Sequence, residues 1–284
     1  MNQASDKTPQ PTIEMFSGAH TLVPYYTNGR VLMPGYQNPG LAVPLDGDYV
    51  VKTDLNRSPY PWLRERMERK SRQFTTFASD MKQFADFSDV RDRDVDGRTP
   101  YLPNGYFSYG DALALTTILA TRKPARYVEI GSGNSTKFAR RAIGKYGLNT
   151  KIECIDPNPR SSVREIADKW VPEGLLDVDP SYFQSLEDGD VLMLDGSHLL
   201  FHGSDTTHFF LRIYPLLKSG VIVHVHDIHL PYEYPEVCDR LFWNEQYILA
   251  MLFYYKPISD IIAPIKFMHH EGMCEEGASF WFEV

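Results

Sequence analysis

The feature that most constrains the fold is the alternation of short apolar runs with helical segments, which begins after Pro124 and continues along the rest of the chain. Apolar runs predict strands, and apolar residues that recur every three to four positions predict helices between them. Strands are expected at 126–130, 150–155, 175–178, 190–194, 221–225, 260–265 and 279–284, and helices at 109–121, 135–146, 162–170, from 205 onward and at 235–255. This order predicts a doubly wound, Rossmann-like α/β sheet whose final two strands, with no helix between them, pair antiparallel at one edge.

The N-terminal part of the chain has a different character. Residues 1–58 are rich in Pro, Gly, Asn and Tyr, and their prolines predict an irregular arm. Between Pro61 and Phe87 large apolar side chains recur at helical spacing, which predicts an amphipathic helix with one face to be covered. We therefore divide the chain into an arm with a helical cap or oligomerisation region, residues 1–104, and an α/β domain, residues 105–284. The apolar helix face is the reason to expect a homodimer.

Composition disfavours several classes of partner. The 284 residues include 29 Lys and Arg against 37 Asp and Glu, and the net charge of −8 disfavours nucleic acid. The opening residues show no basic start followed by an apolar run, and the longest apolar stretch, 247–255, is shorter than the ~20 residues that a bilayer span needs. Three cysteines without a CxxC pair indicate reduced thiols. We expect a cytoplasmic protein with neither a nucleic acid nor a membrane as its partner.

The first predicted strand runs into a glycine turn that is typical of nucleotide sites. The turn Gly131-Ser132-Gly133 follows Glu129 and opens a helix at Ser135, and the free N–H groups of a helix start favour an anionic ligand group. Asp156 stands 23 residues after Gly133, at the end of the second strand, where its carboxylate can accept both hydroxyls of a ribose. This combination predicts a nucleoside-containing cofactor.

The residues around the turn narrow the choice of cofactor. A dinucleotide fingerprint has a third glycine where this chain has Thr136, so a pyrophosphate and a nicotinamide dehydrogenase are disfavoured. No Gly-Lys-Ser/Thr follows the turn, which excludes a P-loop. Glu129 suits an ammonium group, and the helix start suits a carboxylate. S-adenosylmethionine, an amino acid joined to a nucleoside, satisfies both requirements.

The sequence resembles the class I S-adenosylmethionine-dependent methyltransferases, and within them the small-molecule branch grouped as methyltransferase family 24. The pieces that carry the resemblance are VEIGSGNST, CIDPNP, LEDGDVLMLDGSH, LKSGVIVHVHDIHLPYEYP and WNEQYILAMLF, within residues 105–284. The resemblance implies a seven-stranded sheet with a reversed last strand. It also implies that the glycine turn surrounds the methionine part of S-adenosylmethionine, that Asp156 binds its ribose, and that a residue of 177–179 lies near its adenine. The expected cofactor-binding residues are Glu129, Gly131, Ser132, Gly133, Ser135, Asp156, Asp177 and Asp195.

Ionisable residues follow the fourth and fifth strands and predict the place of the chemistry. Methyl transfer to a hydroxyl needs an aligned acceptor and a group that removes its proton, for which histidine is suited. Period-two alternation puts His224 and His226 on one face of the fifth strand, and His224 is interpreted as a core residue. His198 or His229 is the expected base, with Asp227 orienting an imidazole.

A metal is a competing use of the same strand ends. Catechol-type methyltransferases hold a divalent cation with an Asp after the fourth strand and an Asp-Asn pair after the fifth. Asp195 and Asp227 match the two aspartates, but Ile228 replaces the Asn and His226 and His229 flank Asp227, so manganese, iron or zinc would suit this set equally. A divalent metal on Asp195, Asp227 and His229 is therefore left open.

Three functions follow from these residues. The first is a methyltransferase of class EC 2.1.1.- that methylates a small-molecule hydroxyl, with residues 1–104 covering the acceptor site. The second is a metal-dependent oxygenase or hydrolase-like enzyme on the same fold, with Asp195, His198, Asp227 and His229 as ligands. The third is a binding protein without catalysis, which the number of ionisable residues at the strand ends disfavours. The acceptor itself is not identified, since sugars, polyketides, phenols and amino-acid derivatives all fit.

Overall fold

The computed structural model describes residues 59–159, 162–235, 238, 241, 243–257 and 260–284, together with three earlier strands. The chain divides into two compact units, Met1–Tyr49 and Val50–Val284. Where the sequence predicts an irregular arm, the first unit contains a three-stranded antiparallel sheet of β1 (Tyr25–Thr27), β2 (Arg30–Pro34) and β3 (Pro39–Pro44). The prolines Pro34, Pro39 and Pro44 are strand-end residues, where a missing N–H is tolerated. The predicted boundary at residue 104 stays a prediction.

The second unit is built on a seven-stranded sheet in the order β6-β5-β4-β7-β8-β10-β9. Strands β4 to β8 are parallel to one another, whereas β10 is antiparallel to both β8 and β9. This topology confirms the predicted doubly wound sheet with a reversed last strand. The strand bounds are β4 Arg126–Ile130, β5 Lys151–Ile155, β6 Lys169–Val171, β7 Val191–Leu194, β8 Ile222–Val225, β9 Ile261–Pro264 and β10 Phe280–Glu283.

The third strand lies earlier in the chain than the sequence predicts. Residues 175–178 were expected to form it, but η1 (Leu175–Asp177) is a 3-10 helix. The strand is β6, in which Trp170 pairs with Cys154 of β5. The helix expected at 162–170 is correspondingly short, α5 (Val163–Ile166). Aromatic and β-branched residues suit a strand better than a helix, and here they outweigh the helical spacing.

Two further elements differ from expectation. A short helix, α10 (Ile265–His270), separates β9 from β10, although no helix was expected there. After β7 the chain forms α7 (Asp205–His208), a π-helix (Phe209–Ile213) and a 3-10 turn (Tyr214–Leu216) in place of one helix. Pro215 lacks an N–H and cannot continue a regular α-helix, which explains this ending. The last long helix was expected to begin at Pro235, and its described part is α9 (Glu245–Tyr255). A further short helix, α6 (Ser181–Gln184), precedes β7.

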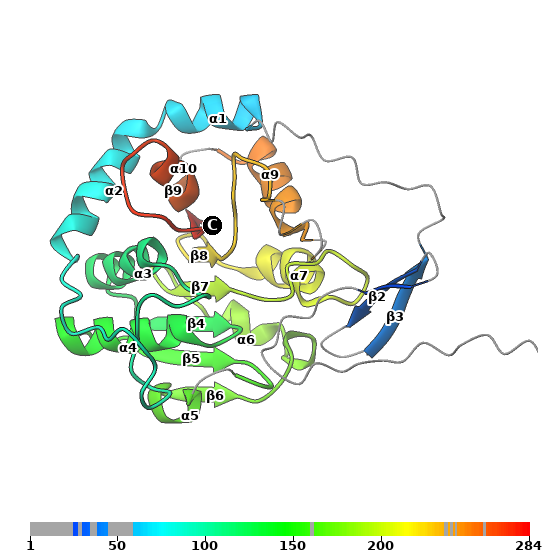
Figure 1. The fold of residues 1–284 in the computed structure, drawn as a ribbon, viewed down its shortest axis with the longest axis horizontal. Coiled ribbons are helices and arrows are strands. Elements are labelled where there is room, and N and C mark those ends of the chain that lie inside the picture. Colours follow the sequence, from blue (N-terminus) through cyan, green and yellow to red (C-terminus); the bar gives the residue numbers. More distant parts are fainter. Residues whose placement is uncertain are drawn as a thin grey trace, which may run out of the picture. The chain divides into compact units, whose positions relative to one another are not determined.

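The apolar face of the N-terminal helices is covered by the chain itself. The predicted single helix is broken into α1 (Pro61–Glu68), which contacts α9, and α2 (Ser71–Gln83), which contacts β9 (Figure 1). Phe74 is fully buried and meets Phe267 of α10 edge to face, with ring centroids 5.9 Å apart. The face that suggested a homodimer is therefore used within one chain, and the homodimer stays a prediction.

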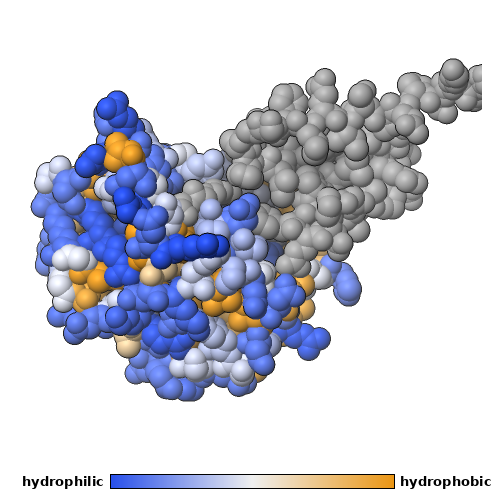
Figure 2. Space-filling view, turned by 90° about the horizontal axis from the view of Figure 1, so that it is seen from below, coloured by the Kyte–Doolittle hydropathy of each residue, from blue (hydrophilic) through white to orange (hydrophobic). Residues whose placement is uncertain are grey.

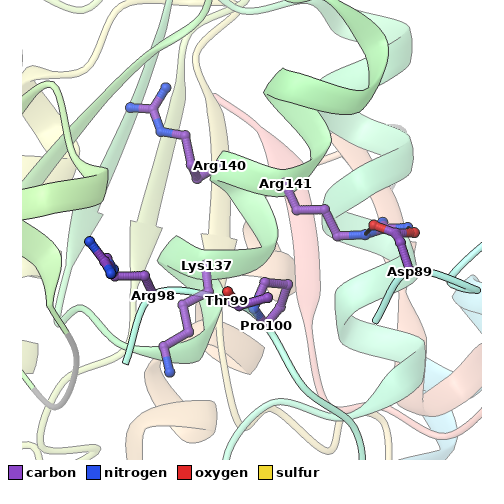
Figure 3. Close-up of a pocket in the computed structure, with 7 residues that line it drawn as sticks. All are labelled: Asp89, Arg98, Thr99, Pro100, Lys137, Arg140 and Arg141. Carbon is purple, nitrogen blue, oxygen red and sulfur yellow. Dashed lines mark hydrogen bonds and ion pairs between the residues drawn. The ribbon is translucent and has the colours of Figure 1, made fainter. Parts of the chain in front are cut away.

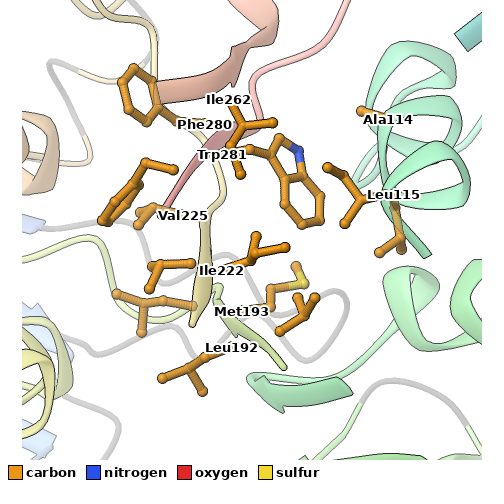
Figure 4. Packing of buried hydrophobic residues seen from close by; sticks show 14 of the residues in the cluster. Ala114, Leu115, Leu192, Met193, Ile222, Val225, Ile262, Phe280 and Trp281 are labelled. Carbon is orange, nitrogen blue, oxygen red and sulfur yellow. The ribbon is translucent and has the colours of Figure 1, made fainter. Parts of the chain in front are cut away.

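The core lies between the sheet and the helices that pack on it. Helices α3 (Tyr109–Arg122) and α4 (Asn134–Tyr146) pack side by side. Figure 4 shows Leu115 of α3 beside the indole of Trp281 in β10. Every residue of β7 and β8 is buried, as expected for strands covered on both faces. The described surface in Figure 2 is largely hydrophilic, and no helix among the described residues has the length and apolar character to cross a membrane.

The carboxyl ends of the parallel strands gather at one edge of the sheet, where Figure 1 shows the arrowheads of β4, β5, β6 and β7. Successive strands are added on one side of β4 up to β6 and on its other side from β7 onward, so the strand order reverses between β4 and β7. At this point the Asp195 N–H donates to the Ile130 carbonyl at 2.9 Å. Gly131 follows with φ +80°, and a Cβ on it would lie 1.9 Å from the Asp195 carbonyl oxygen. Only glycine fits this position.

We expect Gly131→Ala to destabilise the protein by about 3 kcal/mol or more, because the added methyl group meets backbone and the left-handed conformation is strained. The measurement is urea unfolding followed by circular dichroism. Gly144→Ala is the matched control, because Gly144 lies in α4 with open space around its Cβ position. That change should stabilise by up to about 1 kcal/mol, and equal effects of the two substitutions would contradict the structure.

Candidate active site

The glycine turn after β4 is tied to the next strand by Asp156. One carboxylate oxygen of Asp156 accepts the Ser132 N–H at 2.8 Å, and the other accepts the Asn158 N–H at 2.7 Å. The Trp170 indole N–H of β6 donates to the Asp156 carbonyl at 2.9 Å. The Ser132 hydroxyl is buried and has no hydrogen-bond partner among the described residues. A buried hydroxyl in a turn at a helix start is a donor that a ligand can use.

Glu129 lies beneath this turn and is completely buried. Its carboxylate accepts the Tyr127 hydroxyl at 2.6 Å and the Thr136 hydroxyl at 2.5 Å, and the Thr136 oxygen accepts the Gly133 N–H at 3.1 Å. Burial raises the pKa of Glu129 to about 7, although these hydrogen bonds oppose the shift. Thr136, which sequence reasoning used only to exclude pyrophosphate, thus connects Glu129 to the turn.

The remaining predicted cofactor residues lie in different surroundings. Ser135 is buried in the first turn of α4, near Asn134, whose amide donates to Asn104 at 3.2 Å. Asp177 ends η1 and is exposed in the connection after β6. Asp195 follows β7 and is half-buried. Contact of these residues with a cofactor stays a prediction.

The structure brings Asp195, His198 and Asp227 together at the ends of β7 and β8. His198 Nε2 lies 3.5 Å from Asp195 Oδ1 and 3.6 Å from Asp227 Oδ2. One ligand atom from each of these residues falls within 4.8 Å of those of the other two. His198 and Asp227 have positive φ angles of 61° and 56°, so tight left-handed turns direct both side chains to this place.

His198 is held by the start of α9. Its Nδ1 lies 2.8 Å from Glu245 Oε2, and Glu245 is fully buried. The ring of Trp243 packs against the imidazole, with centroids 4.4 Å apart. Burial opposes protonation, but the hydrogen bond to Glu245 and the charges of Asp227 and Asp195 outweigh it and raise the pKa of His198 to about 9.

His226 is the site residue that sequence reasoning missed. Its Nδ1 lies 3.6 Å from Asp227 Oδ2 and 3.8 Å from Asp195 Oδ1, while its Nε2 lies 3.4 Å from Asp111 Oδ2 of α3. Alternation along the strand predicted that His226 shares a face with His224. The two rings do lie on one face, with centroids 5.8 Å apart, and it is the left-handed turn at Asp227 that brings its carboxylate to His226.

The other histidines of this segment separate into a core residue and a residue at the margin of the site. His224 is fully buried and stacks on Trp281 at 4.0 Å, as predicted for a core histidine. His229 is half-buried beside Tyr234, with ring centroids 5.6 Å apart, and its backbone N–H donates to Gln246 at 3.0 Å. Burial, with Lys266 nearby, lowers the pKa of His229 to about 4. The described contacts do not place its ring between Asp195 and Asp227, so its role stays a prediction.

Asp205 lies in the first turn of α7 but does not cap this helix. Ser204 is the cap of α7 and accepts the Thr207 N–H at 3.1 Å. Asp205 instead accepts the Ser197 N–H at 2.9 Å and the Ser197 hydroxyl at 2.5 Å. It therefore fixes the loop that carries Asp195 and His198.

A separate basic pocket of about 250 Å³ lies on the outer face of α4 (Figure 3). Its cations are neutralised by acids, because each forms an ion pair. The pairs are Arg98 with Glu165 at 2.6 Å, Lys137 with Asp94 at 2.8 Å, Arg140 with Asp168 at 2.6 Å and Arg141 with Asp89 at 2.5 Å. The strand-end residues, and not this pocket, form the candidate active site.

The fold and this site define a doubly wound α/β protein of the nucleoside-binding kind. Residues 128–228 match the family model described as a methyltransferase domain (Methyltransf_24). The chain therefore carries a methyltransferase domain over this segment, and the resemblance in its motifs is confirmed. An uncharacterized protein of Archaeoglobus fulgidus is 37% identical over 95 residues, which cover 31% of this chain and less than half, 42%, of that protein.

Solved structures with a similar fold have low sequence identity. The SAH-bound methyltransferase PaMTH1 of Podospora anserina is 15% identical, with a TM-score of 0.40, over 80% of this chain and 99% of that chain. The methyltransferase MycE of the mycinamycin biosynthetic pathway, in complex with Mg, SAH and mycinamycin VI, is 13% identical, with a TM-score of 0.40, over 64% of this chain and 51% of that chain. The strand order of this chain, and not these likenesses, defines its fold.

The raised pKa of Glu129 predicts a pH-dependent stability. The folded state holds the proton up to about pH 7, whereas the reference pKa is 4.5, so this group stabilises at low pH and the contribution is lost as the pH rises through 7. Glu129→Gln removes the dependence. Relative to wild type, the free energy of unfolding of the variant should rise by about 3 kcal/mol between pH 4.5 and pH 8, as measured by urea unfolding at both pH values. If the free energies of unfolding of variant and wild type differ by the same amount at both pH values, the raised pKa of Glu129 is contradicted.

Proposed function

We propose that the chain transfers a methyl group from S-adenosylmethionine to a hydroxyl of a small molecule. The observation that carries this proposal is the direct contact between the glycine turn and the strand end that bears Asp195. A cofactor on the turn would lie next to the cluster of Asp195, His198 and Asp227 because Gly131 abuts the Asp195 carbonyl. The methyltransferase match over 128–228 supports the same reaction.

The residues at the turn fit the two ends of this cofactor. The start of α4 and the buried Ser132 hydroxyl can hold the amino-acid carboxylate, and the carboxylate of Asp156 can accept ribose hydroxyls. Glu129 is beneath the turn, so we assign it to positioning Thr136 and Gly133. When bound, S-adenosylmethionine supplies an electrophilic methyl group on a sulfonium.

Proton removal from the acceptor is assigned to His229. His198 is engaged by Glu245 at Nδ1 and faces two carboxylates at Nε2. His229 is half-buried at the same strand end and its ring is not held by a carboxylate in the described contacts, so an acceptor can reach it. A positioned imidazole of this kind typically contributes about 10²–10⁴ in rate.

The other expectations carry less support. A metal-dependent oxygenase or hydrolase-like enzyme is not favoured, because the matched segment is a methyltransferase domain. Covering of the acceptor by residues 1–104, a homodimer and a cytoplasmic location stay predictions.

The cofactor assignment is tested by calorimetric titration of the full chain with S-adenosylmethionine and S-adenosylhomocysteine. We expect both to bind, and we expect Asp156→Ala to weaken each by about tenfold or more, because a charged hydrogen-bond acceptor is lost. Glu187→Gln is the control, because Glu187 is exposed and pairs with Lys218 at the opposite end of the sheet. Absence of binding by the wild-type chain would overturn the proposal.

The base assignment is tested with radiolabelled S-adenosylmethionine and a panel of phenols, sugars and hydroxylated amino acids. For an acceptor that is methylated, His229→Ala should lower kcat by about 100-fold or more while the affinity for S-adenosylhomocysteine stays unchanged. His202→Ala, at an exposed position, is the control. A variant with wild-type kcat would remove His229 from the reaction.

A further inference from the structure

We propose that residues 86–107, which we call the strap, are held along α4 by ion pairs that dissolved salt can screen, and that the closed strap fixes the start of α4 for the cofactor. The strap is then a conformational device whose closure depends on ionic strength. Its effect on cofactor affinity rests on the proposed function, whereas its closure on α4 does not.

The strap belongs to a long irregular connection. Residues 84–108 join α2 to α3 and contain no helix or strand, only an isolated bridge between Arg91 and Tyr101. Irregular connections longer than about 12–15 residues in a compact domain usually have a function of their own. This one makes specific contacts, since the Leu102 N–H donates to the Arg91 carbonyl at 2.8 Å and the Ser162 N–H donates to the Gly97 carbonyl at 3.2 Å.

Ion pairs align the strap with α4. Three basic residues, each four positions from the next, form one stripe along this helix, and each pairs with an aspartate of the strap. The pairs are Lys145 with Asp86 at 2.8 Å, Arg141 with Asp89 at 2.5 Å and Lys137 with Asp94 at 2.8 Å. As the strap advances, its partners move back toward the first turn of α4. The ion pairs therefore lead the strap to the glycine turn.

The two sides of these pairs differ in exposure. The side chains of Lys137 and Arg141 are only 2% and 6% exposed, whereas their partners Asp94 and Asp89 are 41% and 52% exposed. Figure 3 shows Asp89 at the end of the Arg141 side chain, and the ring of Phe87 covers the guanidinium at 4.3 Å. Because the acids face solvent, dissolved ions screen each pair. Higher ionic strength should loosen the strap and leave the core unchanged.

The far end of the strap contacts the start of α4 and the ionisable cluster. Asn104 Oδ1 accepts the backbone N–H groups of Tyr106 and Phe107 at 3.1 and 2.7 Å. The same oxygen accepts the side-chain amide of Asn134 at 3.2 Å, and Asn134 is the first residue of α4, directly after the glycine turn. Phe107 is buried and stacks on His226 with centroids 5.1 Å apart. The closed strap thus supports both parts of the candidate site.

Closure of the strap and binding of the cofactor are linked through the start of α4. The N–H groups of this helix start are the proposed donors to the cofactor carboxylate. With the strap open, Asn134 loses its contact with Asn104, and binding must also order the helix start. Cofactor affinity should therefore fall as the strap opens, and the bound cofactor should favour the closed strap by the same factor.

The test of closure is hydrogen–deuterium exchange of the full chain without added ligand, at about 0.05 M and about 0.5 M NaCl. The amides of Tyr106 and Phe107 report closure, because Asn104 accepts both. At the lower salt concentration, Asp89→Asn combined with Asp94→Asn should speed their exchange by about threefold or more, because two ion pairs lose their charge. The wild-type chain should approach the variant at the higher salt concentration.

The matched control is Glu187→Gln, which removes an exposed ion pair with Lys218 and should exchange like wild type at both salt concentrations. Calorimetric titration of the same samples with S-adenosylhomocysteine tests the link to the cofactor. The double variant should bind about threefold or more weakly at low salt, and the gap to wild type should narrow at high salt. Circular dichroism establishes that each variant is folded, and Asp89→Asn alone serves if the double variant is not.

The inference is overturned if the amides of Tyr106 and Phe107 exchange equally in wild type and double variant, or if salt has no effect on the wild-type exchange. It is also overturned if their exchange is faster in the variant while its affinity for S-adenosylhomocysteine is unchanged. A wild-type chain that binds no S-adenosylhomocysteine would overturn the proposed function, and the exchange measurement would then decide on closure of the strap by itself.

Discussion

The close approach of two backbone segments, Gly131 after β4 and Asp195 after β7, is the constraint on which the site depends. These strands lie next to each other in the sheet although their ends, Ile130 and Leu194, are 64 positions apart in the chain, and the Asp195 N–H bonded to Ile130 fixes their register. A side chain at position 131 would push the strand ends apart. The cofactor turn and the ionisable cluster are therefore placed by one contact.

Buried carboxylates then hold the cluster in shape. Glu129 supports the turn from below, Asp156 ties it to β5, and Glu245 and Asp111 flank the two histidines. Buried acids are costly unless they are paired, and each of these four has a hydrogen-bond or ion-pair partner. The same pairs connect α3, α4 and α9 to the sheet edge, so the helices that complete the fold also position the chemistry.

Much of this arrangement could be predicted from local sequence. The parallel strands are continuous apolar runs, and the glycine turn with Asp156 marks the cofactor side, because these signals depend on neighbouring residues. Glu245 could not be predicted, because it meets His198 across 47 residues of chain. His226 does share a face with His224, as alternation predicts, but the approach of Asp227 to His226 could not be predicted, because it depends on the left-handed turn at Asp227. Trp170 lies in a strand because it pairs with Cys154, a contact that helical spacing does not reveal.

The left-handed backbone at His198 and Asp227, with φ of 61° and 56°, has a consequence for how this protein can change. Glycine adopts such angles without strain, whereas a side chain there costs on the order of 1 kcal/mol. Selection for a more stable chain and selection for an active one therefore favour different residues at these two positions. A descendant that lost its chemistry would be free to place glycine at both, and the residue found there would record whether the site is still in use.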